Sequence, residues 1–176
     1  CANRIAVLTS AAMPRIFHEA DLRKGRYSQP RGLYLITKCL KPCHQLAAEQ
    51  RDDVVNAFLH ARSRGILLLH AFVVMPDHWH VLGSLGAQKT LSQSVWSVCR
   101  RASFAWRKFG RKPQWQDGFH DHKVRGDKTV LDIVHYIESN PVRKKFVAKP
   151  EEWLWSSARP ESAEFLDRAF LGHERW

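Results

Sequence analysis

The sequence predicts an α+β fold, a ferredoxin-like split βαβ sandwich in which an antiparallel sheet carries helices on one face. Two observations support this fold class. Segments with strand-like and helix-like patterns alternate in the order β-α-β-β-α-β-α, as the split βαβ arrangement requires. The 176 residues also suffice for one domain with a full hydrophobic core.

The first half of the chain supplies three strands and one helix. Residues 32–37 are rich in branched and aromatic side chains, which indicates a strand. Residues 46–63 place apolar side chains at spacings of three and four, as an amphipathic helix does. Residues 66–74 are nearly all apolar and predict a buried strand. Pro76 then begins a turn, so residues 78–82 return as the next strand.

The second half adds two helices and a strand. Residues 91–109 carry the clearest apolar stripe at helical spacing, and residues 115–124 are expected to form a strand. Residues 129–140 predict a third helix. This helix should end near Asn140, because the following proline disfavours the helical conformation of the residue before it.

Three parts are expected along the chain. Residues 1–26 form an N-terminal extension to which we assign no role, and residues 27–149 form the domain itself. Residues 150–176 form a C-terminal tail, rich in Trp and Glu, that packs on the domain.

The charge balance indicates a polyanionic partner. The chain has 28 Lys and Arg against 17 Asp and Glu, a net charge of +11. Such an excess favours nucleic acid first and a membrane surface second. No apolar run reaches the roughly 18 residues of a membrane span.

The four cysteines contain no C-x-x-C pair and are expected to be reduced thiols of a cytoplasmic protein. An alternative is that Cys39 and Cys43, with the adjacent His44, form half of a zinc site. The sequence has no second pair of ligands to complete such a site.

Residues 75–80 read Met-Pro-Asp-His-Trp-His and are the strongest candidate metal-binding segment. On a strand, His78 and His80 share one face while Trp79 points to the other. Trp79 would anchor the strand in the core and leave both imidazoles on the open face. The alternative is that these histidines are structural or merely exposed. A second such pair, His120 and His122, lacks the apolar residue between its members.

Tyr136 is the candidate nucleophile. Asp132, Tyr136 and Asn140 repeat at four-residue spacing, on a polar face beside the apolar stripe of their helix. The alternative is a half-buried core tyrosine. A two-histidine metal site and a presented tyrosine in a basic protein suggest DNA strand cleavage through a phosphotyrosine link.

The candidate DNA-binding residues are cations that cluster in two places. Residues 96–112 contain six cations and no acid, and Arg143, Lys144 and Lys145 follow the tyrosine helix. The six are Arg100, Arg101, Arg107, Lys108, Arg111 and Lys112. Arg100, Arg107 and Arg111 align opposite the apolar stripe, which favours phosphate contact over an ordinary solvated face of mixed charge.

Together these residues resemble the single-tyrosine HUH transposases, specifically the REP-associated tyrosine transposases of bacteria. The resemblance is carried by residues 32–37, 75–80, 115–122, 136–142 and 153–157, and it covers roughly residues 26–158.

The resemblance implies a metal site with a third ligand. His78 and His80 would hold a divalent ion, Mn²⁺ or Mg²⁺, with Asn140 as the third ligand and Asp132 as its substitute. His122 falls in a family-like segment, as a DNA contact or a structural residue.

It also implies the substrate and the setting. Tyr136 would attack single-stranded DNA at a hairpin of a repetitive extragenic palindrome, leaving a 5′-phosphotyrosine, without a nucleotide cofactor or a membrane. The protein would be a monomer rather than a dimer, in the bacterial cytoplasm and at the nucleoid when bound to DNA. Two other readings stay open, a non-catalytic hairpin-binding module on the same fold and a metallohydrolase unrelated to nucleic acid.

Overall fold

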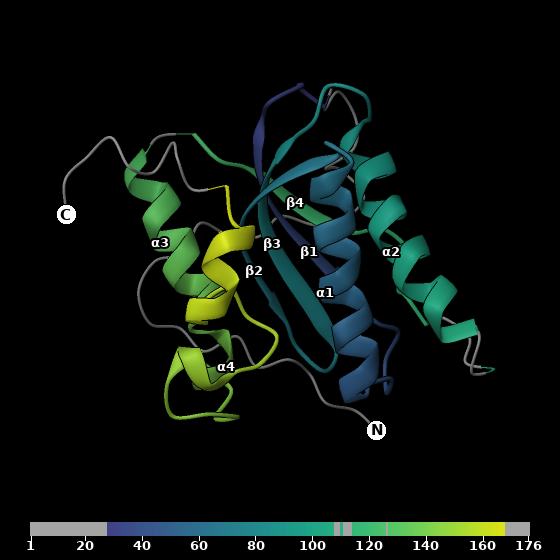
Figure 1. The fold of residues 1–176 in the computed structure, drawn as a ribbon, viewed down its shortest axis with the longest axis vertical. Coiled ribbons are helices and arrows are strands. Elements are labelled where there is room, and N and C mark those ends of the chain that lie inside the picture. Colours follow the sequence, from purple (N-terminus) through teal and green to yellow (C-terminus); the bar gives the residue numbers. More distant parts are fainter. Residues whose placement is uncertain (1–27, 108–109, 111–113, 126, 168–176) are drawn as a thin grey trace.

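Four strands form one antiparallel sheet in the order β2-β3-β1-β4 (Figure 1). The computed structural model describes residues 28–107, 110, 114–125 and 127–167. The strands are β1 (Leu33–Cys39), β2 (Leu67–Val74), β3 (His78–Leu85) and β4 (His120–Lys123). This order is that of the split βαβ fold, so the predicted α+β class and antiparallel sheet are confirmed.

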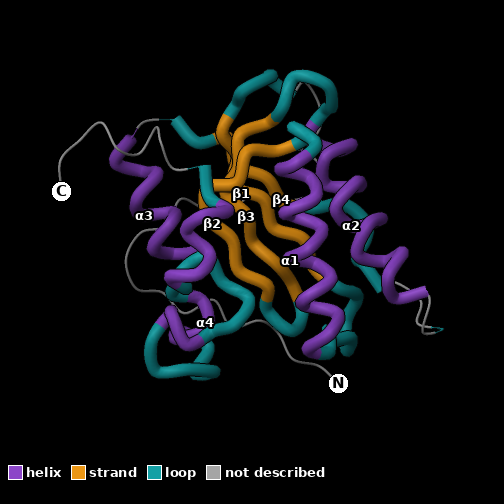
Figure 2. The backbone as a smooth tube through the Cα atoms, in the orientation of Figure 1, coloured by secondary structure: helices purple, strands orange, loops and turns teal. Residues whose placement is uncertain are grey.

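The helices are α1 (Ala48–Ser63), α2 (Leu91–Arg107), α3 (Asp127–Glu138) and the short α4 (Asn140–Arg143). Two 3₁₀ turns follow, at Pro150–Glu152 and Pro160–Phe165 (Figure 2). None of the helices in the described part of the chain has the length and apolarity that a membrane crossing requires.

Two elements differ from their predicted bounds. The strand expected over 115–124 is reduced to β4, and Trp115 makes only an isolated bridge to Leu40. The helix expected over 129–140 is broken at Ser139, after which α4 begins. Proline occurs in the first turn of α4, where its missing N–H has no intrahelical partner to lose.

The helices cover both faces of the sheet, so the expectation that they share one face is wrong. On β3, Trp79 packs edge-on against Phe58 of α1, with ring centroids 5.2 Å apart. The next residue, His80, faces Tyr136 of α3 on the other side of the sheet. The physical reason lies in β2, whose side chains are buried on both faces apart from Leu68, so each face needs a cover.

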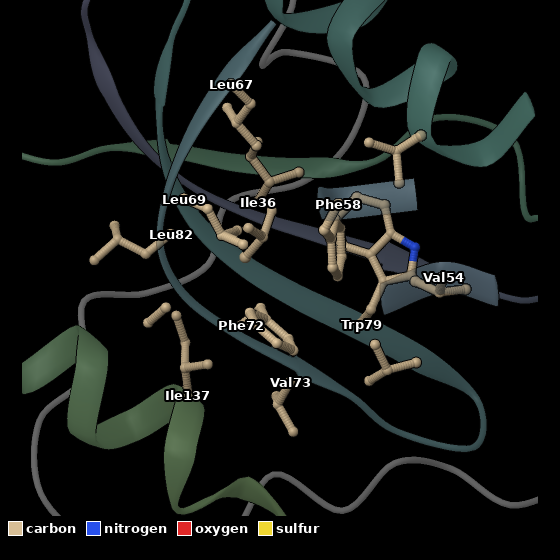
Figure 3. Close-up of a cluster of buried hydrophobic side chains, with 14 of the residues drawn as sticks. Ile36, Val54, Phe58, Leu67, Leu69, Phe72, Val73, Trp79, Leu82 and Ile137 are labelled. Atoms are coloured by element: carbon tan, nitrogen blue, oxygen red, sulfur yellow. The ribbon is translucent and has the colours of Figure 1, made fainter. Parts of the chain in front are cut away.

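The core therefore has two layers (Figure 3). Phe58, Phe72 and Trp79 fill the α1 side, where each is at most 2% exposed. Leu82 and Ile137 lie on the α3 side and are fully buried. The second layer fixes α3 on the sheet and thereby fixes the position of Tyr136.

Residues after Pro150 run along the outer edge of β2. Val74 donates its N–H to the carbonyl of Trp155 at 2.8 Å, and Ser157 donates to Phe72 at 2.9 Å. Further along, Arg62 forms a two-pronged ion pair with Asp167 at 2.9 Å. These contacts occupy backbone groups that β2 would otherwise leave unpaired.

Candidate active site

Two imidazoles converge on one point of the sheet. The Nε2 atoms of His78 and His80 are 3.1 Å apart. Two nitrogens on adjacent corners of an octahedral ion, each about 2.1 Å from it, lie about 3.0 Å apart. The pair therefore has the separation expected for two ligands of one divalent ion. The two side chains also share one face of β3, as the alternation of the strand predicted.

Each imidazole is held from its far side. Asp77 lies with Oδ1 2.6 Å from Nδ1 of His78, and Thr37 of β1 lies with Oγ1 2.7 Å from Nδ1 of His80. When Nδ1–H donates to these oxygens, both Nε2 lone pairs point toward the shared site. Sequence reasoning assigned no role to Asp77 or Thr37. The sequence did place Thr37 on a strand. Its position opposite His80, however, depends on how β1 aligns with β3, which the sequence pattern does not reveal.

Tyr136 reaches the histidines from α3, although 56 positions separate it from His80. The ring centroids of His80 and Tyr136 are 5.6 Å apart, and Tyr136 is half-buried. The structure thus brings the predicted nucleophile beside the predicted metal ligands.

The break between α3 and α4 adds positive charge to this site. The short helix α4 carries Arg143 back over Tyr136, with the guanidinium carbon 5.0 Å from the ring centroid. The pKa of the Asp77 carboxyl is lowered chiefly by its hydrogen bond with His78, and the charge of Lys144 lowers it further. Arg143, Lys144 and Lys145 are all exposed, as phosphate-binding side chains must be.

Burial holds His80 in its neutral form. Removal from water is the largest cause that lowers its pKa well below the usual value, and the neighbouring His78 adds to the effect. Asp77 acts in the opposite direction, and Arg143 lowers the pKa further. A neutral imidazole is the form that binds a metal, so His80 is available as a ligand at neutral pH.

Asn140 is buried one turn beyond Tyr136. Its Nδ2 donates to the backbone carbonyl of Tyr136 at 3.0 Å, which leaves Oδ1 as the atom that a metal could take. Asp132 is exposed. Within the described residues, no third His, Cys, Asp or Glu joins the two histidines in a group able to hold a metal.

His120 and His122 lie on the same face of the sheet as the histidine pair. His120 pairs with Thr37, which also pairs with His80, so these three side chains form a row across β4, β1 and β3. His122 is exposed two residues further along β4.

The predicted basic helix lies on the opposite side of the sheet. Arg100, Arg101 and Arg107 are exposed on α2, which packs beside α1 (Figure 1). Lys108, Arg111 and Lys112 lie outside the described residues. Arg143 of α4 therefore lies at the tyrosine site, whereas the arginines of α2 lie on the other side of the sheet, away from Tyr136.

The three cysteines that the structure describes take no part in the site. Within the described residues, Cys39, Cys43 and Cys99 form no disulfide, and none belongs to a group able to hold a metal. Burial raises the pKa of the Cys99 thiol to about 12, so it stays protonated.

Known proteins with similar sequences point to one family. A REP-associated tyrosine transposase of Escherichia coli (strain K12) is 27% identical over 123 residues, covering 69% of this chain and 73% of that protein. A Haemophilus influenzae (strain Rd) protein, assigned provisionally to the same family by name, is 28% identical over 156 residues, covering 80% and 84%. No model of a known protein family matches the chain.

A solved structure agrees with the sequence relatives. It is a REP-associated tyrosine transposase bound to a REP hairpin, 26% identical, with a TM-score of 0.65. The match covers 76% of this chain and 80% of that chain. The predicted resemblance to REP-associated tyrosine transposases is thereby confirmed.

Proposed function

We propose that this chain is a REP-associated tyrosine transposase that cleaves and rejoins single-stranded DNA at REP hairpins through a phosphotyrosine at Tyr136. One observation carries the proposal: the convergence of two imidazole Nε2 atoms, 3.1 Å apart, beside the ring of Tyr136. The similarity to proteins of that name supports the choice of substrate.

His78 and His80 would hold a divalent ion, with Asn140 supplying a third, oxygen ligand. Two imidazoles and an oxygen suit Mn²⁺, and Mg²⁺ is the more abundant alternative. When bound, such an ion neutralises charge on the scissile phosphate and orients it.

The chain's own residues perform the covalent step. The phenolic oxygen of Tyr136 attacks phosphorus and gives up its proton, while the bond to the 3′-oxygen breaks and that oxygen gains a proton. The products are a 5′-phosphotyrosine and a free 3′-hydroxyl, and attack by another 3′-hydroxyl reverses the step. No nucleotide cofactor is required, because the phosphotyrosine conserves the energy of the broken bond.

Arg143 would help position the phosphate. Its guanidinium lies over the ring of Tyr136 and presents several N–H donors, which match phosphate oxygens in geometry and charge. It would also stabilise the negative charge that develops at the reacting centre.

The test is a covalent adduct. The protein is incubated with a 5′-extended DNA hairpin and Mn²⁺, denatured, and separated by electrophoresis. We expect a protein band shifted by the attached strand, which requires the metal and disappears with EDTA. Tight hairpin binding without any adduct would instead identify a non-catalytic binding module.

A further inference from the structure

The exposed face of α2 carries two large aromatic side chains that the tyrosine site does not use. Trp96 is 63% exposed and Phe104 is 60% exposed, each with Arg100 one helical turn away. The guanidinium carbon of Arg100 lies 5.6 Å from the centroid of Trp96. A single exposed aromatic residue needs no explanation, but an aromatic–arginine–aromatic row on one helix face indicates a binding surface.

A hollow of about 560 Å³ lies beside Trp96. It is lined by the first turns of α2 and by Gln88 and Lys89, which precede the helix. Lys89 donates from Nζ to Oγ of Ser97 at 2.9 Å, which fixes its ammonium group at the wall of the hollow. The hollow therefore offers a flat aromatic ring, two cations and amide groups within one small space.

The charged side chains that line this hollow have a single sign. Its lining includes Lys89 and Arg100 and contains no Asp or Glu. Such a lining favours an anionic partner. The partner must also present a flat face to Trp96, which nucleic acid does through its bases.

We propose that this hollow binds an unpaired nucleotide of the DNA substrate, with the base stacked on Trp96 and the phosphate between Lys89 and Arg100. The identity of the ligand as DNA rests on the proposed function. Phe104 would take a second base along the same strand. Trp96 and Phe104 are separated by about 12 Å along the helix axis. In a duplex the faces of the bases are covered by the neighbouring base pairs, whereas unpaired bases can separate and stack on two rings that far apart, so the occupant is a single strand.

The hollow lies on the α1 and α2 side of the sheet, whereas Tyr136 lies on the α3 side. It is therefore a binding site without a role in the chemical step. Substitution at Trp96 should change affinity and leave the rate at saturating DNA unchanged.

The experiment compares Trp96→Ala with Trp96→Phe in the full chain. Phe165→Ala, at an aromatic residue of the tail, is the matched control. The probes are a DNA hairpin with a 5′ single-stranded extension and a blunt duplex of the same composition. Fluorescence anisotropy gives the affinities, and adduct formation at saturating hairpin gives the rate.

We expect Trp96→Ala to weaken binding of the extended hairpin roughly ten- to hundredfold, the effect of losing one stacked base. Trp96→Phe should recover most of the affinity, because it restores an aromatic face. The blunt duplex should bind both variants and the parent protein alike, and Phe165→Ala should change nothing.

Unchanged affinity in Trp96→Ala, or an equal loss for hairpin and duplex, would overturn the inference. If the parent protein forms no adduct but Trp96→Ala still weakens single-strand binding, the nucleotide site stands while the transposase proposal fails. If adduct forms normally and Trp96→Ala binds as the parent does, the nucleotide site alone fails.

Discussion

The two faces of the sheet differ in what their side chains contact. On the α3 face, His78 and His80 are each held by a second residue, and the ring of Tyr136 contacts both His80 and Arg143. On the α2 surface, Trp96 and Phe104 are more than half exposed. Fixed geometry suits a chemical step, and exposed rings and charges suit the capture of a long ligand. Substitutions on the first face should therefore change rates, and those on the second should change affinities.

The largest expected effect is at the nucleophile. Tyr136→Phe keeps the ring and its contact with His80 but removes the attacking oxygen. Cleavage should fall by a factor on the order of 10⁴ or more, the usual scale for a covalent nucleophile, while DNA affinity stays at the parent level. Single-turnover cleavage of a labelled hairpin measures this. A variant that nicks DNA near the parent rate would remove Tyr136 from the mechanism.

The metal ligands come next. His78→Ala and His80→Ala should each abolish metal-dependent cleavage, because each removes one of two converging Nε2 atoms. His120→Ala is the matched control on the same face of the sheet, and it should leave metal binding intact. Titration calorimetry with Mn²⁺ tests the pair directly. Unchanged affinity in His78→Ala would exclude the site.

A smaller loss is expected at Thr37, which orients His80 without reaching the metal position. Thr37→Val should weaken Mn²⁺ binding roughly ten- to hundredfold, the usual cost of losing a group that orients a ligand. Thr37→Ser retains the hydroxyl and should bind as the parent does. Equal affinity in the Val and Ser variants would show that the 2.7 Å contact to His80 does not support the site.

The mildest effect is expected for three of the predicted phosphate contacts, two on α2 and one, Arg111, outside the described residues. Replacing Arg100, Arg107 and Arg111 together by Ala should weaken cognate and scrambled single strands alike, because phosphates carry no sequence. Each lost contact should reduce the slope of log affinity against log salt by about 0.7. An unchanged slope would place the DNA elsewhere. If the variant instead lost its preference for the cognate strand over the scrambled strand while keeping most of its affinity, these arginines would be reading bases.

The sequence predicted the reactive residues better than their surroundings. Strand alternation placed His78 and His80 on one face, and helical spacing presented Tyr136, because both depend on local geometry alone. The contact between Thr37 and His80 depends on the register of β1 against β3, which no local pattern encodes.

The position of α3 was predicted wrongly, although the apolar run of β2 already indicated that both faces of the sheet are covered. On α2, the apolar spacing correctly predicted the buried side, which includes Trp106. The pattern of cations predicted a binding face but gave no role to Trp96 and Phe104, whose rings the structure shows to be exposed.

The contacts of residues 153–167 with β2 set a lower limit on the piece of chain that can be expressed alone. A fragment ending at residue 149 would uncover the backbone groups of Phe72 and Val74 and remove two buried tryptophans, Trp153 and Trp155. An open strand edge beside newly exposed apolar surface is a template for pairing between molecules. Such a fragment would retain His78, His80 and Tyr136 and yet accumulate as aggregate, so the smallest stable piece of the chain has to extend through Asp167.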